Sequence, residues 1–494
     1  MVDELIGYDA IGLSELIRKG DITAIELLDI VIDRIEKINP KLNAVVYKMY
    51  DQARVAAIDM ISGTKFPKLS GSIFFGVPFL LKNFFVECKD TPFTDGSQSV
   101  RGYTSKLDSE IVKRHKANGL IIVGKSNTSE FGILTTTEPT YYGPTYNPWD
   151  LSLTPGGSSG GAAAAVASGI MPMAHGSDGG GSIRIPASCC GVFGLKPTRG
   201  RNPLGPLFGD VGGGIIHEHG LTRTVRDSAA LLDVTSGPEL GDPYYAPPKN
   251  DPYLREARRD PGKLKIGFLS RVPEGWNEET TLHPDCEAAV KDAALLCEDL
   301  GHTVEEISSD QIAFPDLPQN FILIFISVVG QVFAYWEREL GKKIKQDEVE
   351  SVTWELYQES LKTTGASYLV ALENLQRFSR KLAIWYHKRN FDLLLSPTMT
   401  IPPTKIGAFD PTPEDPMKSI SIALSYVAFT RTQNITGQPA MSVPLYWNEN
   451  EIPIGVQFAG RFGDEVSLFR LAGQLEQARP WADKKPPIHC TNTF

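Results

Sequence analysis

Residues 155–198 contain two clusters in which serine lies among glycines, and they constrain the fold more than any other segment. The first is Gly156-Gly157-Ser158-Ser159-Gly160-Gly161, and the second is Asp178-Gly179-Gly180-Gly181-Ser182. Glycine lets backbone amides turn towards a ligand, because no Cβ forbids a positive φ or a close contact. The serine that ends the triple glycine is therefore a candidate nucleophile beside a row of N–H groups that would stabilise an oxyanion. The alternative is two flexible turns flanking a helix, since glycine and serine are common in turns.

A lysine interrupts an apolar segment that precedes these clusters. Residues 73–86 read IFFGVPFLLKNFFV, the composition of a buried strand, and Lys82 is their one charged residue. Burial disfavours the charged form of an amine and lowers its pKa, so a buried Lys82 would be able to act as a base. A lysine at a strand end can instead extend its amine into solvent. The local pattern alone favours this second interpretation.

Two short motifs spell well-known sites but lack the context that those sites need. Residues 119–126 fit the phosphate-loop pattern GxxxxGK[ST], yet the intervening Leu-Ile-Ile-Val favours a strand over a bent loop. Residues 156–160 fit GxSxG, the nucleophile turn of α/β-hydrolases, but no apolar strand precedes them. A Ser-His-Asp site would need a histidine, and none of the eight histidines lies in a supporting motif. The candidate base is therefore a lysine.

The composition is that of a soluble globular protein. The chain has 494 residues, of which 41% are hydrophobic and 22% charged, and its formal net charge of −10 argues against a nucleic-acid partner. We expect no signal peptide, because the first residues are acidic, and no membrane partner, because the longest strongly apolar run, residues 321–329, is short. Six cysteines without a CxxC pair indicate reduced thiols. We therefore expect a cytoplasmic protein.

The order of predicted elements indicates an α/β protein. In residues 9–65, predicted to be helical, Thr23 and Glu26 form a capping box and Asn39-Pro40 ends the apolar periodicity. Residues 238–263, rich in proline and charge, mark a boundary or exposed crossover. Residues 310–390 are expected to be mainly helical, and their apolar patch at 321–333 can wall a pocket or fill a core, with the core favoured. Further helices are predicted at 108–118, 162–167 and 284–300, and strands at 120–123, 264–269, 302–307, 392–398, 441–447 and 452–460.

Taken together, these segments resemble the amidase-signature family of hydrolases over nearly the whole chain. That resemblance implies an α/β fold in which a mixed sheet of about ten strands lies between helical layers. It also implies one domain over residues 1–494, with an N-terminal helical region (1–65), a catalytic signature core (66–237) and the remainder of the sheet (263–494), including pocket helices at about 310–390. The matching motifs are Gly76-Val77-Pro78 with Lys82, Gly124-Lys125-Ser126-Asn127, the first serine cluster, Gly181-Ser182-Ile183-Arg184 with Pro186, Gly194-Leu195-Lys196-Pro197-Thr198, Thr224-Val225-Arg226-Asp227 and Gly437-Gln438-Pro439-Ala440.

The resemblance implies a catalytic triad of serine, cis-serine and lysine. Carried onto this sequence, Ser182 is the nucleophile, Ser158 is the bridging serine after a cis peptide bond, and Lys82 is the base. Ser159 is expected to assist, and Asp178 and Arg184 are expected to brace the loop. The oxyanion hole would consist of the backbone N–H groups of Gly179, Gly180, Gly181 and Ser182.

Two positions depart from the family's pattern. Asn83 follows Lys82 where the family often has an acid, and Gly179 stands where it often has threonine. Neither change removes a catalytic atom, but both can alter the field around the lysine or the stiffness of the loop. Within the family, residues 136–139, 147–149, 183–190 and 194–201 look most like the aminohexanoate cyclic-dimer (nylon-oligomer) hydrolases. That branch implies a small, uncharged or cyclic amide as substrate.

Three classes of function remain after these steps. The first is a stand-alone amidase that forms an acyl-enzyme, and the second is an amidotransferase subunit that releases ammonia from glutamine for a partner protein. The third is a non-catalytic scaffold, against which the presence of Lys82, Ser158 and Ser182 together argues. No metal or organic cofactor is implied, and His217-Glu218-His219 lacks the HExxH spacing of a zinc site. The oligomeric state is open, with a homodimer as one candidate.

Overall fold

One large mixed sheet organises the chain. The computed structural model describes residues 4–62, 71–276, 280–412, 415 and 417–492. Within these residues the sheet has eleven strands in the order β1-β3-β2-β4-β6-β5-β10-β11-β9-β7-β8. The strands are β1 (Val45–Lys48), β2 (Val77–Lys82), β3 (Leu120–Ser126), β4 (Met173–Asp178), β5 (Phe193–Lys196), β6 (His217–Thr222), β7 (Lys265–Phe268), β8 (Thr303–Glu306), β9 (Leu393–Pro397), β10 (Ala440–Trp447) and β11 (Pro453–Gly460).

The sheet combines parallel and antiparallel pairs. β2 is parallel to both β3 and β4, and β7 is parallel to both β8 and β9. The strands between these two groups pair antiparallel, as do β1 and β3. The predicted α/β architecture with a mixed sheet is therefore confirmed. The division of the chain into the predicted regions stays a prediction.

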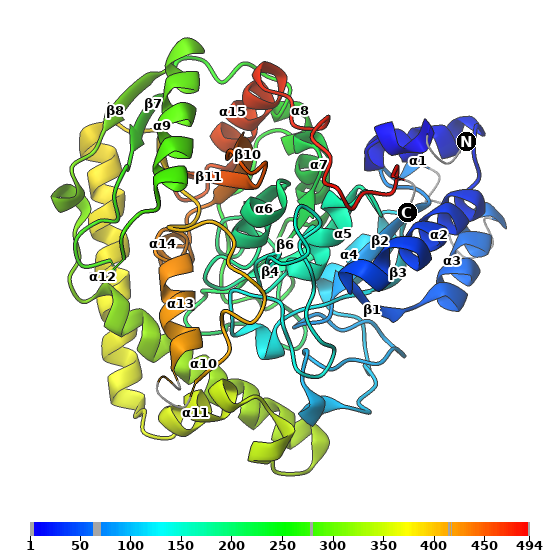
Figure 1. Cartoon of the computed structure of the whole chain (residues 1–494), viewed down its shortest axis with the longest axis horizontal. Helices are drawn as coiled ribbons and strands as arrows, with labels where there is room; N and C mark the ends of the chain where they lie inside the picture. Colours follow the sequence, from blue (N-terminus) through cyan, green and yellow to red (C-terminus); the bar gives the residue numbers. More distant parts are fainter. Residues whose placement is uncertain (1–3, 63–70, 277–279, 413–414, 416, 493–494) are drawn as a thin grey trace.

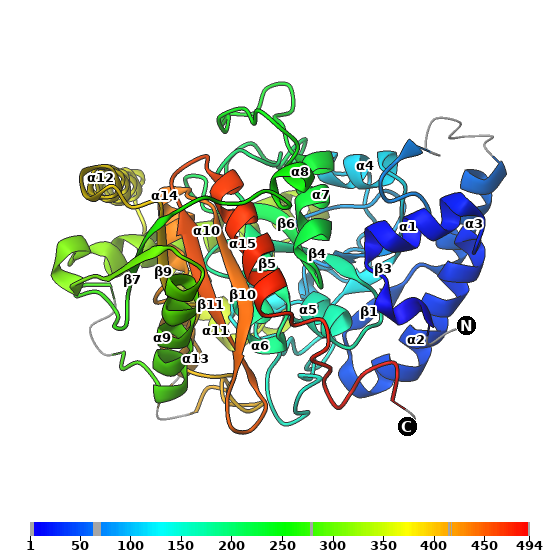
Figure 2. The same ribbon diagram turned by 90° about the horizontal axis from the view of Figure 1, so that it is seen from above.

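Helices surround this sheet along its whole length. Figure 1 shows α1, α2 and α3 grouped at the β1 end, and α9 and α12 at the β8 end. Figure 2 shows the same two groups at opposite ends when the molecule is seen from above. The helices are α1 (Ala10–Lys19), α2 (Ala24–Leu42), α3 (Tyr50–Ser62), α4 (Glu110–Ala117), α5 (Gly160–Ala167), α6 (Arg184–Cys190), α7 (Val225–Thr235), α8 (Tyr253–Glu256), α9 (Pro284–Asp299), α10 (Leu317–Leu340), α11 (Ser351–Ser360), α12 (Gly365–Arg389), α13 (Lys418–Tyr426), α14 (Arg431–Thr436) and α15 (Glu465–Ala478).

The N-terminal region differs from its prediction in two details. The capping box of Thr23 and Glu26 is present, but α2 continues through Pro40 and ends at Leu42. A proline in the last turn costs only one backbone donor, and Asn43 adopts the left-handed conformation that ends the helix. Residues 45–48 form a strand where a helix was predicted, because they pair with β3 at the edge of the sheet.

The phosphate-loop spelling at residues 119–126 does not form a loop. All of β3 is buried, and it includes Gly124, Lys125 and Ser126, so the strand is longer than the predicted 120–123. The amine of Lys125 donates a hydrogen bond to the carbonyl of Pro92 at 2.5 Å. Because Lys125 is buried in the strand and bonded to this carbonyl, it is not placed to bind a phosphate.

α10 both fills the core and faces a cavity. Phe321, Ile324 and Val329 on this helix are buried, whereas Phe325 and Ile326 line a cavity, so both interpretations of the apolar patch apply. Among helices in the described part of the chain, α10 alone is long and apolar enough, by length and composition, to cross a membrane. The apolar segment is therefore longer than the run of residues 321–329 indicated. α10 packs along α11 and α12.

Small residues in the middle of the sheet allow α6 to lie close to it. On β5, Phe193 and Leu195 pack into a core with α7, α9 and α15, so Gly194 faces the opposite side. A Cβ at Gly194 would lie 2.7 Å from the Cβ of Ala187 on α6, and a Cβ at Gly455 would lie 2.8 Å from the Cα of Ser188. The absence of a Cβ at these two glycines therefore lets α6 lie this close to the sheet. That distance also places the second serine cluster, which immediately precedes α6.

We predict that Gly194→Ala destabilises the protein by about 1–3 kcal/mol, the usual cost of overpacking, because α6 must move away from β5. The control is Gly365→Ala in α12, where an added Cβ meets nothing within 4 Å. This control should leave the free energy of unfolding unchanged or raise it by up to about 1 kcal/mol. Urea denaturation followed by tryptophan fluorescence measures both, and equal midpoints for the two variants would contradict the close packing of α6.

Candidate active site

Lys82 ends β2 with its side chain inside the protein. The residue has no exposed surface, and its Nζ lies 2.6 Å from Ser158 Oγ and 2.9 Å from Ser177 Oγ. The interpretation of a strand-end lysine that reaches solvent is therefore wrong. Burial lowers the pKa of this lysine to about 7, against the opposing effect of the carboxylates of Glu218, Asp178 and Asp95. A large share of the amine is thus neutral at neutral pH.

Ser158 lies between Lys82 and the first turn of α5. The peptide bond between Gly157 and Ser158 is cis, as expected from the resemblance. Glycine is required at position 157, because a Cβ there would lie 2.1 Å from the carbonyl oxygen of Thr136. Ser158 is buried, and it lines the same cavity as Ser177 and Ser182.

Asp178 and Arg184 form a buried ion pair beneath the second serine cluster. Arg184 donates from Nε and Nη2 to the two carboxylate oxygens of Asp178, at 3.0 and 2.8 Å. Neither side chain is exposed. Burial alone would raise the pKa of Asp178, but the charge and hydrogen bonds of Arg184 together with Asn434 hold it well below its usual range. The loop between β4 and α6 therefore closes on a fixed carboxylate, which also accepts from the N–H of Ile183 at 3.2 Å.

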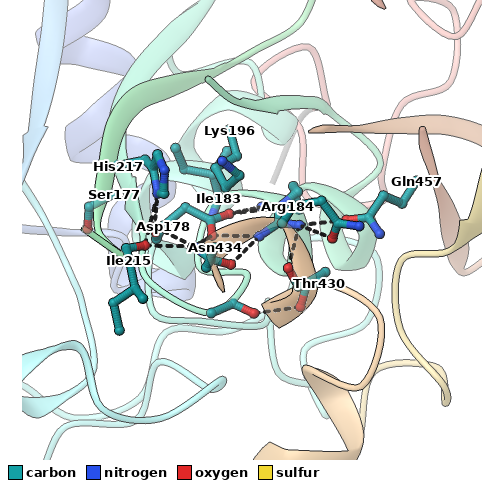
Figure 3. Close-up of polar contacts among 12 residues, drawn as sticks. Ser177, Asp178, Ile183, Arg184, Lys196, Ile215, His217, Thr430, Asn434 and Gln457 are labelled. Atoms are coloured by element: carbon teal, nitrogen blue, oxygen red, sulfur yellow. Dashed lines mark hydrogen bonds and ion pairs between the residues drawn. The ribbon is translucent and has the colours of Figure 1, made fainter. Parts of the chain in front are cut away.

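Residues from the C-terminal part of the chain complete this network (Figure 3). Arg184 donates to the carbonyl of Thr430 at 2.8 Å and to the side-chain oxygen of Gln457 at 2.6 Å. Asn434 donates to the carbonyl oxygens of Asp178 and Ile215, at 2.8 and 3.0 Å. The bracing role expected of Asp178 and Arg184 thus has partners on α14 and β11 that no local motif indicated.

Two glycines of the second cluster and the serine that ends it lie at the cavity. Gly179, Gly180 and Ser182 line it, and Gly181 has a positive φ of 141°. A Cβ at Gly181 would lie 2.5 Å from the hydroxyl of Thr430, which donates to the carbonyl of Gly180. In the described part of the chain, the N–H groups of residues 179–182 donate to no other group. The N–H groups of Gly179, Gly180 and Ser182, which line the cavity, thus have no acceptor among the described residues.

Ser159 and Ser177 connect the two serine clusters. The N–H of Ser159 donates to the carbonyl of Ser182 at 3.2 Å, and its hydroxyl donates to the carbonyl of Ser177 at 3.3 Å. Ser177 was not singled out from the sequence, although it directly precedes Asp178. Its hydroxyl is the second oxygen within hydrogen-bond distance of Lys82 Nζ.

The cavity in front of these serines has a volume of about 100 Å³ and mostly apolar walls. None of the described residues that line it is charged, and none is a histidine. A larger open groove of about 460 Å³ between α10, α11 and α12 contains none of the predicted site residues. The apolar lining of the cavity comes from the predicted pocket helices, from α13 and its C-terminal end, and from three segments that follow β2, follow β3 and precede β6: Phe84, Phe131, Ile133, Ile215, Ile216, Phe321, Ile322, Phe325, Ile326, Val328, Leu356, Ile420, Ala423, Leu424 and Val427.

The family model for amidases matches residues 26–469 of this chain. The chain belongs to the amidase family. It is 36% identical over 489 residues to a 6-aminohexanoate-cyclic-dimer hydrolase from Pseudomonas sp. (strain NK87), covering 97% of this chain and 96% of the relative. This amidase is therefore a hydrolase that acts on carbon–nitrogen bonds other than peptide bonds, and the predicted likeness to that branch is confirmed.

Solved structures agree with this assignment. The structure of 6-aminohexanoate cyclic dimer hydrolase superposes with a TM-score of 0.91 at 36% identity, over 98% of this amidase and 99% of that chain. A glutamyl-tRNA(Gln) amidotransferase chain from Thermotoga maritima is a more distant neighbour. Its TM-score is 0.73 at 26% identity, over 95% of this amidase and 98% of that chain.

The two departures from the family's pattern are accommodated locally. Asn83 is buried, and its amide donates to Thr94 Oγ1 at 2.9 Å, so it adds no charge beside Lys82. A Cβ at Gly179 would come no closer than 3.4 Å to Ile216, which is ordinary contact. The amidase therefore has room for a side chain at position 179 but carries none.

We predict that Arg184→Met destabilises the amidase by about 3–5 kcal/mol, because it leaves the carboxylate of Asp178 buried without its ion-pair partner. The control is Arg377→Met, which breaks an exposed pair with Glu373 on α12 and should change stability by less than about 1 kcal/mol. Chemical denaturation measures both. The double variant Asp178→Asn/Arg184→Met should recover part of the loss, and no recovery would contradict the charge-based explanation.

Proposed function

We propose that this amidase cleaves its substrate through Ser182, with Ser158 as the proton bridge and Lys82 as the base. The observation that carries this proposal is the contact of 2.6 Å between Lys82 Nζ and Ser158 Oγ, at a lysine without exposed surface. A neutral amine has one lone pair, and the Ser158 hydroxyl is within reach of it. The presence of Ser182 on the wall of the same cavity supports its role as nucleophile.

The proposed reaction has two stages. In the first, the O–H bond of Ser182 breaks as its Oγ bonds to the amide carbon, and the proton passes through Ser158 to Lys82. The carbon–nitrogen bond then breaks, and the amine leaves with the proton returned from Lys82. In the second, water attacks the acyl-enzyme, gives one proton to Lys82 through Ser158, and releases the acid. That proton returns to Ser182.

The amides of residues 179–182 are the proposed oxyanion hole. Their N–H groups have no other acceptor in the described part of the chain, and Gly179, Gly180 and Ser182 line the cavity. Removal of one such donor typically costs about 2.7–4 kcal/mol of transition-state stabilisation. In this proposal, the ion pair of Asp178 and Arg184 keeps these donors in place and Ser159 ties the loop to α5.

The proposed substrate is an uncharged amide with an apolar acyl group. The aromatic and aliphatic walls of the cavity favour such a group, and a charged one would lose its hydration there without a partner. The cyclic dimer of 6-aminohexanoate, the substrate named for the relatives, is itself uncharged. We therefore place this amidase with hydrolases of small linear or cyclic amides.

The alternative is an amidotransferase subunit that hydrolyses glutamine. Free glutamine carries an ammonium and a carboxylate, and no charged side chain lines the described cavity to pair with either. The more distant likeness to the amidotransferase chain also favours the stand-alone enzyme.

We predict that Ser182→Ala lowers amide hydrolysis at least about 1,000-fold and abolishes labelling by phenylmethanesulfonyl fluoride, because the nucleophilic oxygen is gone. Intact-mass spectrometry with peptide mapping measures the label. The control is Ser168→Ala after α5, a buried serine whose hydroxyl donates to Ala165 and lies outside the cavity. A labelled Ser182→Ala variant would refute Ser182 as the nucleophile.

We predict that hexanamide and the 6-aminohexanoate cyclic dimer are hydrolysed with a kcat/KM at least about 100-fold above that for glutamine, because charged groups gain nothing in the apolar cavity. Product formation by mass spectrometry measures all three reactions. A preference for glutamine, or co-purification of a partner protein, would favour the amidotransferase.

A further inference from the structure

His175 and Glu218 lie on the two strands that follow the strand of Lys82 in the sheet order. The backbone N–H of Lys82 donates to His175 Nδ1 at 3.3 Å, and His175 Nε2 lies 2.7 Å from Glu218 Oε2. His175 is on β4 and Glu218 is on β6, and both side chains are buried. The reaction proposed above uses neither residue.

The first contact determines where the imidazole carries its proton. Because Nδ1 accepts from Lys82, it has no hydrogen, so the proton of a neutral ring is on Nε2. Burial lowers the pKa of His175 to about 3, which keeps the ring neutral. His175 Nε2, which carries that proton, is thus the ring atom 2.7 Å from Glu218 Oε2, although its N–H is not aligned for a hydrogen bond.

The strand register brings Glu218 to the same side of the sheet as the hydroxyl that contacts the lysine. Ser177 and Glu218 are partners in the antiparallel β4–β6 ladder, so their side chains share a face, and His175 lies on that face two residues away. Ser177 Oγ is 2.9 Å from Lys82 Nζ. Glu218 is thus linked to the backbone of Lys82 by way of His175. It is also the strand partner of Ser177, whose hydroxyl contacts the amine of Lys82.

The two other carboxyl groups that act on Lys82 already have their own partners. Asp178 on β4 is paired with Arg184 of α6, and Asp95, after β2, accepts from the indole of Trp336 on α10. His115 on α4 packs edge-on against His175 and is neutral, because burial lowers its pKa. In contrast, neither carboxyl oxygen of Glu218 has an aligned hydrogen bond in the described part of the chain. Burial raises the pKa of Glu218 well above its ordinary value, and the charge of a protonated Lys82 is the one effect that favours its ionised form.

We propose that His175 and Glu218 are positioning residues for Lys82: the imidazole holds the lysine backbone, and the carboxylate makes the buried amine a stronger base. This inference rests on the proposed role of Lys82 as the base. Lys82 and Glu218 compete for a proton, and an ionised Glu218 stabilises the ammonium that forms when Lys82 accepts one. Without that carboxylate, the amine would hold its proton less tightly.

The sign of the expected pH effect follows from this competition. Below the pKa of Lys82 the amine is protonated and cannot accept a proton, so labelling of Ser182 by phenylmethanesulfonyl fluoride should rise with pH, with a midpoint near 7. In Glu218→Gln the midpoint should move to lower pH by about 1 unit or more, because an opposite charge nearby is lost. The plateau rate should fall, since a weaker base assists the serine less.

The matched control is Glu87→Gln, which changes another buried glutamate in the same way. Tyr103 donates to Glu87, and Glu87 is not among the carboxylates that act on Lys82. This variant should keep the wild-type midpoint. An unchanged midpoint in Glu218→Gln, an upward shift, or an equal shift in Glu87→Gln would overturn the proposal.

Two variants of His175 test the positioning role. They keep the proposal testable even if Glu218→Gln does not fold. His175→Asn keeps an oxygen near the place of Nδ1 that can accept from Lys82, whereas His175→Phe has no acceptor. His175→Phe should label at least tenfold more slowly than wild type at every pH, and His175→Asn should recover part of that rate. Equal rates for the two folded variants would overturn the role of His175. Absence of any label on wild-type Ser182 would instead refute the proposed function itself.

Discussion

An amine without access to water is the constraint on which the rest of this site depends. The interior holds Lys82 only because its surroundings suit a largely neutral group: two hydroxyls within 2.9 Å and an apolar cavity beyond them. A charged lysine in that place would cost several kcal/mol of lost hydration. The same burial that disfavours the charge lowers the pKa of the amine to about 7, so that a neutral form able to accept a proton is present near neutral pH. Structure and proposed chemistry therefore have one physical cause.

The second constraint is a buried carboxylate, Asp178, that must remain charged. Asp178 is as deeply buried as Lys82, yet the guanidinium of Arg184 and the amide of Asn434 hold it ionised. The buried acid is thus charged and the buried base largely neutral, because their hydrogen-bond partners differ. The carboxylate fixes the loop that carries Ser182, while the neutral amine remains free to exchange a proton.

Much of this arrangement could be predicted from the sequence, and the reasons differ from residue to residue. Residues 158 and 179–182 are recognisable because their backbone geometry requires glycine neighbours, which leaves a local signature. The burial of Lys82 could not be read from its apolar neighbours alone, because a strand end permits both a buried and a solvent-reaching lysine. Only the family resemblance decided between them.

Other parts of the site leave no local signal. His175, Glu218 and Asn434 act through contacts made across strands and between distant segments, and nothing in their immediate neighbours marks them. The same reason explains why β1 was predicted as helix, since residues 45–48 become a strand only by pairing with β3. Sheet partners, rather than local propensity, decide the conformation of such short segments.

The bracing of the serine loop by Thr430, Asn434 and Gln457 has a consequence for how the protein is made. A ribosome releases Lys82 and both serines long before it reaches these residues, and β10 and β11 must still enter the sheet between β5 and β9. Pairings over such long sequence separations form late, because loop closure costs entropy that nothing has yet repaid. The nascent chain therefore carries every atom of the proposed triad without a working arrangement of them. In the proposed mechanism, the site therefore becomes complete only after almost the whole chain has left the ribosome.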